Sequence, residues 1–500
     1  MNIEDNAEHL VTVRQMFFGN GEAWGTPDAP KQEGFLALAR AGRNVWNAWR
    51  VKWPELPADF NSIDFTKREP IDFSGFIFDR FGREIVHGQV APGDVTFLRA
   101  KFGNQAKFTG AQFGESPNFY DAQFGSLADF DGAKFGTQAI FNGAHFGDLA
   151  SFRNTVFGER TRFDGAQFGH RPDFESAYFG TLSSFIATQF GTNANFYGVA
   201  FEHGVRLDGA QFGDNVVFEN ARFGLNASFR AMTLAEILAE WGRYNSDKIA
   251  LKTRTTRSKG IGAASNVFLS ISFRDACFDG DVTFQDRTFL GPTSFDHTTF
   301  KGVPKLHGCK LHQDTSFDGA DFKAPASPEA ARAYRTLKLA MAQQQATREE
   351  QGFFRLEMQA ENALATGPRR ILFDVYENLS NYGFSLSRPL WFWLICLIGF
   401  SLAHGALADL SHGVRVGAGW LPKGVDWART IDLGEYVLIN AVPLPGFDKV
   451  QSELREVLFR PDTGGLGRIV ILLDVIHKIL ALVALFLAGL ALRNLFKMKG

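Results

Sequence analysis

The sequence predicts a mainly β protein built as a β-solenoid, with helices on both sides of the coil and two apolar helices near the C-terminus. Three observations support this prediction. Phe occurs 52 times and Gly 51 times among 500 residues, an 11-residue motif recurs through the middle of the chain, and two long apolar segments follow it. Because average Gly usage is roughly 7%, a joint excess of Gly and Phe indicates an internal repeat.

The repeat runs without a gap from Phe97 to Ser228 as twelve copies of F-x-x-A-x-F-G-x-x-x-x. The aromatic spacing alternates between five and six residues, and the alternation resumes from Phe268 to Phe322. An 11-residue period can also indicate a right-handed coiled coil. In a helix, however, the two Phe of one repeat would lie about 140° apart, and each Gly would cost roughly 1 kcal/mol. The pattern therefore predicts successive sides of a solenoid coil, each turning one Phe inward.

The inward aromatic residues are expected to stack as ladders, because coils pile up at strand spacing, about 4.8 Å. Stacking buries a continuous core that a single repeat could not form. The small Ala of the motif lets the neighbouring side close in, and the Gly is expected at a corner with positive φ. The predicted core residues include Phe108, Phe113, Phe119, Phe124, Phe130, Phe135, Phe141 and Phe146.

The repeat resembles that of the pentapeptide-repeat proteins, whose unit is A-(D/N)-(L/F)-x-x. The match is the Ala two places before the inward aromatic residue, as in Ala111-Gln112-Phe113, and it extends with gaps from Phe60 to Phe322. The resemblance implies a right-handed quadrilateral β-helix, here with an extra residue on every second side. It also implies a bacterial protein whose helical connector leads into a C-terminal two-span, ion-channel-like membrane region. It says little about activity.

Helices are predicted at both ends of the coil and in its interruption. Residues 33–50 form an amphipathic pattern, and a cap is expected because a solenoid end exposes apolar stacking surface. Thr233 and Glu236 form a capping box within the interruption. The predicted segments are an N-terminal segment and helical cap (1–55), a Phe-rich β-solenoid (56–230), a helix and basic insertion (231–267), a second solenoid block (268–325), a helical connector (326–387) and a two-span membrane domain (388–500) with an extracytoplasmic loop (411–465).

The interruption also carries a basic run. It could contact an anionic partner, either phospholipid headgroups or nucleic acid, or it could be a solvated insertion. No aromatic residue is interleaved in the run, so base stacking is not expected, and the formal net charge of −2 gives no bulk attraction to nucleic acid. No nucleic-acid partner is therefore predicted. The residues of the candidate anionic contact are Lys248, Lys252, Arg254, Arg257 and Lys259.

The sequence contains no nucleotide-binding, serine-hydrolase or zinc-protease motif. We therefore predict no catalytic residue, no cofactor and no metal ligand, and we expect the chain not to be an enzyme. Three histidines and two cysteines of the second block do not form the close-spaced ligand pairs of a zinc site. These residues are His297, His307, His312, Cys277 and Cys309.

Two apolar segments, Pro389–Ala408 and Leu466–Leu492, predict a transmembrane hairpin, because about 20 apolar residues span a bilayer. Small residues recur on one side of each segment, which suits close helix contact in lipid. The second segment carries a polar face on which an acid and a base four residues apart are expected to pair, lowering the cost of burying each charge. The residues of that face are Asp474, His477 and Lys478.

Basic residues flank the hairpin on its outer ends and predict its orientation. Arg369, Arg370 and Arg388 precede the first segment, and Arg493 and Lys497 follow the second. Because cytoplasmic flanks are enriched in Lys and Arg, we expect a multi-pass protein of the bacterial inner membrane with both termini in the cytoplasm. The expected partners are the lipid bilayer and an unidentified protein, and self-association into a homo-oligomer is left open.

The leading hypothesis is a non-enzymatic, membrane-anchored scaffold that presents a rigid cytoplasmic solenoid to a protein partner. The alternative is a subunit of a two-span, ion-channel-like protein with the solenoid as its sensor. A short helix predicted over Ile431–Val442 favours the alternative, but Pro443-Leu-Pro-Gly446 stands where a selectivity filter would lie. A third hypothesis, DNA mimicry against a topoisomerase, is known for some soluble family members and needs more negative charge than these repeats carry.

Overall fold

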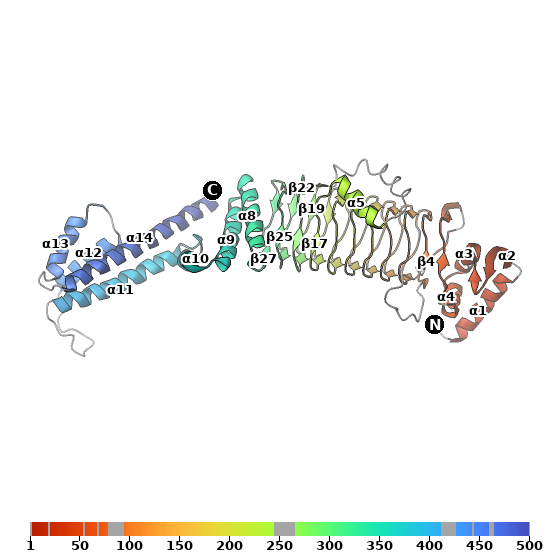
Figure 1. Ribbon diagram of the computed structural model, residues 1–500, viewed down its shortest axis with the longest axis horizontal. Helices are drawn as coiled ribbons and strands as arrows, with labels where there is room; N and C mark the ends of the chain where they lie inside the picture. Colours follow the sequence, from red (N-terminus) through yellow and green to blue (C-terminus); the bar gives the residue numbers. More distant parts are fainter. Residues whose placement is uncertain are drawn as a thin grey trace. The chain divides into compact units, whose positions relative to one another are not determined.

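The structure is a computed structural model. It describes residues 3–18, 21–53, 56–67, 70–78, 95–244, 266–411, 427–442, 445–459 and 465–499. The chain divides into two compact units. The first comprises residues 1–325 and 332–344, and the second comprises residues 326–331 and 345–500. A β-solenoid with helices before and after it fills the first unit, as predicted, whereas the second is helical (Figure 1).

The solenoid is built from parallel two-residue strands, and residues that are 22 positions apart pair in register, as in Gln112 with Lys134 and Phe113 with Phe135. The nine-stranded sheet comprises β5 (Gln112–Phe113), β7 (Lys134–Phe135), β9 (Val156–Phe157), β11 (Tyr178–Phe179), β13 (Ala200–Phe201), β16 (Arg222–Phe223), β20 (Cys277–Phe278), β24 (Thr299–Phe300) and β27 (Asp321–Phe322). The seven-stranded sheet comprises β6 (Gln123–Phe124), β8 (His145–Phe146), β10 (Gln167–Phe168), β12 (Gln189–Phe190), β14 (Gln211–Phe212), β18 (Val267–Phe268) and β22 (Thr288–Phe289).

Shorter sheets form the remaining sides of the coil. The four-stranded sheet comprises β15 (Val216–Val217), β19 (Ile271–Ser272), β23 (Thr293–Ser294) and β26 (Thr315–Ser316). The three-stranded sheet comprises β17 (Ala227–Ser228), β21 (Val282–Thr283) and β25 (Pro304–Lys305). In the first coils, β3 (Ala58–Asp59) pairs with β4 (Val95–Thr96), and a short 3-10 helix, η1, covers Phe65–Lys67. Isolated parallel bridges continue the same sides elsewhere.

Aromatic ladders fill the interior of the solenoid. Most successive rings of a ladder are parallel, and the centroids of Phe113 and Phe135 lie 4.5 Å apart. Neighbouring ladders meet edge to face, as Phe113 and Phe119 do at 5.4 Å and 79°. Both arrangements are favourable for aromatic pairs. All eight predicted core phenylalanines are buried, with at most 4% of any one exposed.

The glycine of the repeat corrects one expectation. We predicted positive φ at this position, but Gly136 and Gly147 do not adopt it. A Cβ on Gly136 would lie 2.5 Å from the carbonyl oxygen of Gly114 one coil below. The position therefore needs glycine because of close backbone approach between stacked coils. Positive φ occurs instead at the other turn positions, for example at Gly132 and Leu127.

Aspartates at the turns tie each coil to the next. Asp164 accepts a hydrogen bond from the Ser184 hydroxyl at 2.5 Å and another from the backbone N–H of Ile186 at 3.0 Å. These donors stand 20 and 22 residues further along the chain, so they belong to the next coil. The carboxylate thus satisfies a turn N–H that stacking would otherwise leave without a partner. The same arrangement recurs at Asp131, Asp208 and Asp296.

Helices at the N-terminus cover the first coil. In α4 the Trp46 ring packs against Phe60, Phe76 and Phe78, and its indole N–H donates to the Ile77 carbonyl at 2.9 Å. The Asn47 amide donates to the Gly75 carbonyl, and its oxygen accepts from the Ile77 N–H. The Asn47 side chain therefore pairs the backbone groups that a neighbouring strand would pair at the open edge of the first coil. The N-terminal elements are α1 (Ile3–Phe17), α2 (Gly21–Trp24), β1 (Gly25–Thr26), β2 (Ala29–Pro30), α3 (Gln32–Arg40) and α4 (Arg43–Lys52).

The opposite end of the coil is covered by α8 (Pro328–Gln343). Its Tyr334, Leu337 and Met341 are buried, and the Tyr334 ring meets Phe322 edge to face at 5.9 Å. The side-chain amide of Gln344 donates to the Leu311 and His312 carbonyls, at 3.3 and 2.9 Å. Both ends of the stack thus have their apolar surface covered and edge carbonyls paired.

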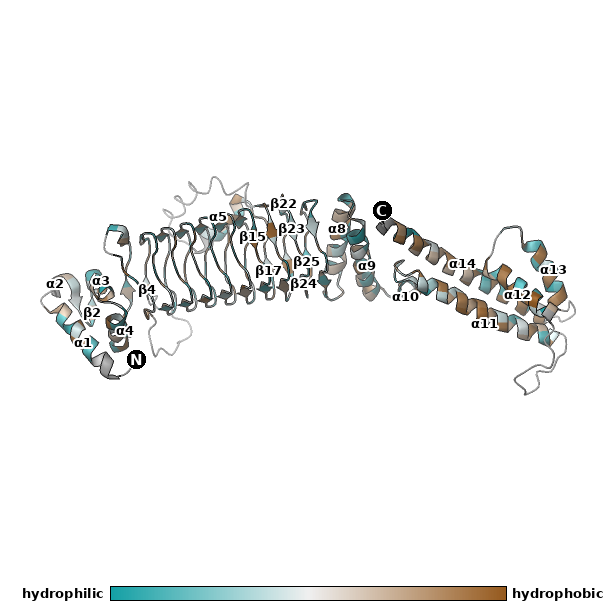
Figure 2. Cartoon of the chain, turned by 180° about the vertical axis from the view of Figure 1, so that it is seen from behind, coloured by the Kyte–Doolittle hydropathy of each residue, from teal (hydrophilic) through white to brown (hydrophobic). Residues whose placement is uncertain are grey.

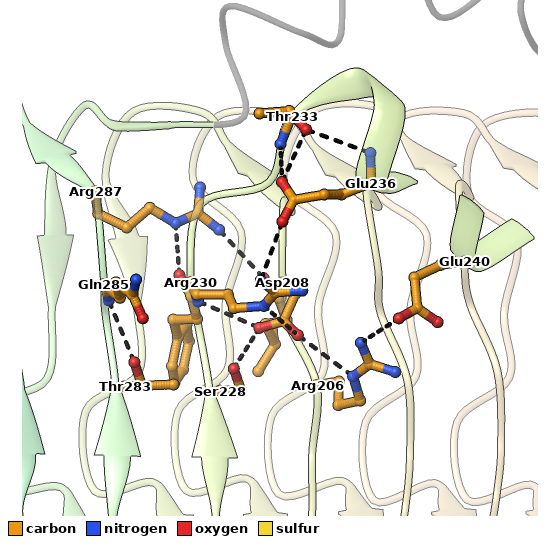
Figure 3. A network of polar contacts seen from close by, with 12 residues as sticks. Arg206, Asp208, Ser228, Arg230, Thr233, Glu236, Glu240, Thr283, Gln285 and Arg287 are labelled. Atoms are coloured by element: carbon orange, nitrogen blue, oxygen red, sulfur yellow. Dashed lines mark hydrogen bonds and ion pairs between the residues drawn. The ribbon is translucent and has the colours of Figure 1, made fainter. Parts of the chain in front are cut away.

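The backbone register continues across the interruption, because Phe212 pairs directly with Phe268. The aromatic ladder changes there, since the Phe212 and Phe268 rings are tilted by 52° and the Arg287 guanidinium lies 4.7 Å from the centre of the Phe268 ring. Helix α5 (Leu234–Tyr244) folds back and buries Trp241 and Ile237 against Ile186 and its neighbours. Figure 3 shows the polar contacts beside it, which include hydrogen bonds and ion pairs. The ion pairs join Arg206 to Asp208 and Glu240, and Arg230 to Asp208 and Glu236. The predicted basic run, Lys248, Lys252, Arg254, Arg257 and Lys259, lies outside the described residues.

The second unit contains two long helices, α11 and α14, that run side by side (Figure 1). Both are long and apolar enough to cross a membrane, which hints at membrane association, and hydrophobic residues dominate them in Figure 2. The elements of this unit are α9 (Thr347–Leu364), α10 (Gly367–Ser380), α11 (Ser387–Ser411), α12 (Trp427–Ala441), α13 (Asp448–Leu458) and α14 (Gly465–Lys499).

Substituting alanine for the motif glycine tests the close approach of the coils. Gly136→Ala should lower stability by about 1–3 kcal/mol, the usual cost of overpacking, because its methyl group meets the backbone of the coil below. Gly103→Ala is the matched control, since the same motif position there has nothing within 4 Å of the added Cβ. Thermal unfolding of the full chain measures both. Equal melting temperatures for the two variants would contradict the stacking explanation.

Candidate functional site

A buried polar cluster, called here the Asp474 cluster, lies among four helices of the second unit. Helix α11 contributes one residue, α12 and α13 two each, and α14 three. Most of these side chains are buried although the surrounding helices are apolar, and polar groups in such a place are expensive unless they pair. The residues are His404 from α11, Tyr436 and Asn440 from α12, Gln451 and Arg455 from α13, and Asp474, His477 and Lys478 from α14.

Asp474 is the centre of the cluster, and its carboxyl group forms hydrogen bonds with four side chains. One oxygen, Oδ1, faces His404 Nε2 at 3.0 Å and Asn440 Nδ2 at 3.1 Å. The other, Oδ2, accepts from the Tyr436 hydroxyl at 2.6 Å and from Arg455 Nη2 at 2.8 Å. The carboxylate therefore has a cationic partner and two hydrogen bonds on each oxygen, which is the condition under which a buried ion pair is tolerated.

The hydrogen bonds of His404 require an additional proton in the cluster. Its Nδ1 lies 2.8 Å from the Phe400 carbonyl oxygen, and its Nε2 lies 3.0 Å from the Asp474 carboxylate. Both partners are acceptors, and a neutral imidazole has one N–H. Either both ring nitrogens of His404 carry hydrogen, or Asp474 is protonated and donates to Nε2. In both arrangements one proton is shared between α11 and α14.

A second chain of hydrogen bonds extends the cluster toward Lys478. The Lys478 ammonium donates to Gln451 Oε1 at 2.6 Å, and Gln451 Nε2 donates to Asn440 Oδ1 at 2.8 Å. This corrects the expected pairing of Asp474 with Lys478: Asp474 binds Arg455 instead, and Lys478 reaches the amide of α13. The expectation considered one helix alone and could not include partners supplied by α12 and α13.

His477, the third residue of the predicted polar face, is fully buried but takes no part in these bonds. Its ring stacks on Phe400, with centroids 4.3 Å apart and planes 6° apart. Among the described residues, neither ring nitrogen of His477 has a hydrogen-bond partner. The structure thus brings Asp474 and Lys478 into one network and leaves His477 beside it.

Apolar contacts close the cluster on the side of α12 and α13. Tyr436 and Val437 pack with Phe459, Leu458 and Val470, and the Trp393 indole N–H donates to the Ala441 carbonyl at 2.8 Å. Burial, together with the hydrogen bond that it donates to Asp474, raises the pKa of Tyr436 well above its ordinary value. The phenol therefore stays protonated and remains a donor. The arrangement holds α12 and α13 against both apolar helices.

Sequence reasoning missed the partners of Asp474 that α12 and α13 supply. Tyr436 and Asn440 stand four residues apart and share a helix face, as do Gln451 and Arg455. That spacing was visible, but nothing in the sequence connects these faces to Asp474.

The histidines and cysteines of the second solenoid block do not come together in the structure. In the described ranges, no group of three or more potential metal ligands occurs, with Cys309 or elsewhere. The Cys309 thiol donates to the Phe284 carbonyl at 3.1 Å.

Comparison with known proteins identifies the repeats. Residues 92–134 and 130–177 match the family Pentapeptide repeats, with nine copies of the repeat. The predicted pentapeptide repeats are therefore confirmed over this part of the chain. No curated protein and no solved structure matches the chain. The comparisons thus identify the repeat over residues 92–177.

The Asp474 cluster predicts a large effect from one substitution. Asp474→Asn removes the charge that Arg455 faces, and breaking a buried pair by removing one partner costs about 3–5 kcal/mol. Because Arg455 is partly exposed, we expect a loss near the lower end, seen as a reduced yield and melting temperature of the detergent-purified chain. Asp474→Asn combined with Arg455→Gln should recover part of the loss. Lys449→Gln, at an exposed side chain of α13, is the neutral control. Full stability of Asp474→Asn alone would contradict this account.

Proposed function

We propose that the chain is a non-enzymatic, membrane-anchored scaffold in which the two apolar helices hold the protein in a bilayer and the solenoid presents its sides to a protein partner. The observation that carries the proposal is that the interior and both ends of the solenoid are already packed with side chains of this chain, whereas its sides are exposed. Its interior is filled by stacked Phe rings, and its two ends are covered by Trp46 and Asn47 of α4 and by Tyr334 of α8. The sides are therefore the surface left for recognition.

The coil in this proposal is right-handed and quadrilateral. Strands of the four solenoid sheets follow one another along the chain at steps of five or six residues, as in β14, β15, β16 and β17, which begin at Gln211, Val216, Arg222 and Ala227. This succession supports four sides per coil. The right hand follows from the resemblance of the repeat to the pentapeptide family.

One side offers a groove suited to a protein ligand. Leu127 and Leu149 line it together with Arg153, Arg171 and Asp173. Both leucines are exposed, and apolar anchors with charges at the rim are typical of protein interfaces. The strands beneath are held by the aromatic ladders, so the groove would bind without rearrangement, which limits the entropic cost of association.

The proposed location is the bacterial cytoplasmic membrane, with both termini and the solenoid in the cytoplasm. The two long apolar helices support the membrane part, and the basic flanks at Arg388 and Arg493 support the orientation. In this arrangement α13 lies on the extracytoplasmic side.

The alternative function, an ion-channel-like subunit, has one observation in its favour. Helix α12 is a short helix between two apolar helices and packs against both. Against it, Asp474 is enclosed by partners within one chain. We expect purified protein in planar bilayers to give no current, with or without Asp474→Asn. A reproducible single-channel current that Asp474→Asn alters would favour the channel over the scaffold.

Capture from native membranes tests the scaffold. Bait carrying Arg153→Glu with Arg171→Glu should lose the proteins that wild-type bait retains after crosslinking, because both substitutions reverse charges at the groove. Lys134→Glu changes an exposed residue of the nine-stranded sheet and should retain them. The groove is excluded as the binding surface if all three baits capture the same proteins.

Cysteine accessibility tests the orientation in a chain whose native Cys277, Cys309 and Cys396 are replaced by serine. Lys449→Cys in α13 should react with an impermeant thiol reagent on intact cells, whereas Lys323→Cys after the last strand should react only after lysis. Both side chains are exposed, so a difference reports the side of the membrane. The reverse pattern would invert the proposed topology.

A further inference from the structure

Helix α10 precedes the first apolar helix. Its apolar face is exposed and its polar face contacts protein, which is the opposite of the usual arrangement in a soluble protein. Its apolar residues Ile371, Leu372 and Val375 recur at one helix face, yet they are 64%, 71% and 42% exposed. A helix on a soluble protein normally turns such a face toward the core. In the described part of the second unit, this apolar face is left uncovered.

The polar face of α10 is the one that contacts protein. The Asn362 amide of α9 donates to Asp374 Oδ1 at 3.1 Å and to Glu377 Oε2 at 2.9 Å. The Tyr382 hydroxyl also donates to Glu377 Oε2, at 3.0 Å. The rotation of α10 about its axis is therefore determined by its acidic side chains, and the outward position of its apolar face follows from that constraint.

The end of α10 is joined to the same end of both apolar helices. The Gly383 carbonyl just after α10 accepts from Asn494 Nδ2 of α14 at 3.1 Å, and Arg388 at the start of α11 donates to the Glu377 carbonyl at 3.1 Å. These contacts place α10 where α11 begins and α14 approaches its end. This is the end with basic residues such as Arg388 and Arg493.

Two exposed arginines at the start of α10 place positive charge beside its apolar face. Arg369 and Arg370 have side chains that are 68% and 64% exposed, and they pair within the chain with Glu361 and Asp374. Exposed pairs of this kind contribute little stability, so the guanidinium groups remain free to contact phosphate oxygens, to which Arg is well matched. Basic residues beside an apolar helix face are typical of helices that lie on anionic membranes.

We propose that α10 is an interfacial helix that inserts Ile371, Leu372 and Val375 into the cytoplasmic leaflet, with the phosphates of anionic phospholipids bound by Arg369 and Arg370. The proposal rests on the membrane anchoring proposed above. The partner is the lipid surface rather than a protein, because α10 is joined at its end to two helices that are long and apolar enough to span the bilayer. Such helices lie about 5–10 Å deep, at the boundary of headgroups and acyl chains.

Depth-dependent fluorescence quenching tests the position of α10. In the full chain with its native cysteines replaced by serine, a fluorophore is attached to Leu372→Cys, Leu402→Cys or Leu339→Cys. All three leucines are exposed, and they lie in α10, α11 and α8. Each variant is reconstituted into vesicles that contain lipids spin-labelled either near the headgroup or near the end of the acyl chain. We expect the probe at Leu372 to lose more fluorescence to the shallow label, that at Leu402 more to the deep label, and that at Leu339 to neither.

The outcomes separate the two proposals. If the Leu402 probe is not quenched by either lipid, the membrane anchoring fails and this inference fails with it. If Leu402 is quenched by lipid while Leu372 is quenched only by aqueous iodide, the interfacial position alone is wrong. If Leu372 is shielded from both lipid and iodide, another copy of the chain covers the face, and the lipid proposal is also overturned.

A second comparison tests the anionic headgroups. Vesicles of phosphatidylcholine with phosphatidylglycerol should give a larger shallow-label loss at Leu372 than vesicles of phosphatidylcholine alone. Arg369→Gln with Arg370→Gln should remove that increase, whereas Arg348→Gln in α9 should leave it unchanged. An increase that persists without Arg369 and Arg370 would overturn the phosphate contact.

Discussion

The solenoid depends on one constraint: each aromatic ring must lie directly on the ring one coil below, at the spacing that backbone pairing allows. The ring-centroid separations within the ladders, such as 4.5 Å between Phe113 and Phe135 and 5.3 Å between Phe190 and Phe212, are close to the strand spacing of about 4.8 Å. Side-chain packing and backbone hydrogen bonding therefore reinforce the same register. The glycine of the repeat and the aspartates at the turns both serve this stacking, the first by allowing close approach and the second by pairing turn N–H groups.

The period of the repeat made the solenoid predictable, because the alternation of five and six residues identifies which side chains point inward. It did not determine why the motif glycine is needed. The atoms that exclude a Cβ at Gly136 belong to Gly114, in another coil, and contacts between coils appear only when the stack is assembled. The role of the turn aspartates could not be predicted for the same reason, since Asp164 and its donor Ser184 belong to successive coils.

The Asp474 cluster shows the limit of sequence reasoning for the candidate site. A charged residue in an apolar segment is conspicuous, so Asp474 and Lys478 could be singled out. Their partners could not, because Tyr436, Asn440 and Arg455 come from segments without a repeat, and nothing in the sequence connects the faces of those helices to Asp474. The same holds for α10, whose outward apolar face is set by the contacts of Asp374 and Glu377 with Asn362 and Tyr382.

The side chain of Asn47, which takes the place of a strand at the first coil, has a consequence for assembly. Every coil has the same register as the next, so the uncovered start of one solenoid would fit the uncovered end of another. Such a head-to-tail contact does not close on itself and would propagate into filaments. The helices that cover the two ends, together with the amides of Asn47 at one end and Gln344 at the other, therefore oppose such head-to-tail polymerisation.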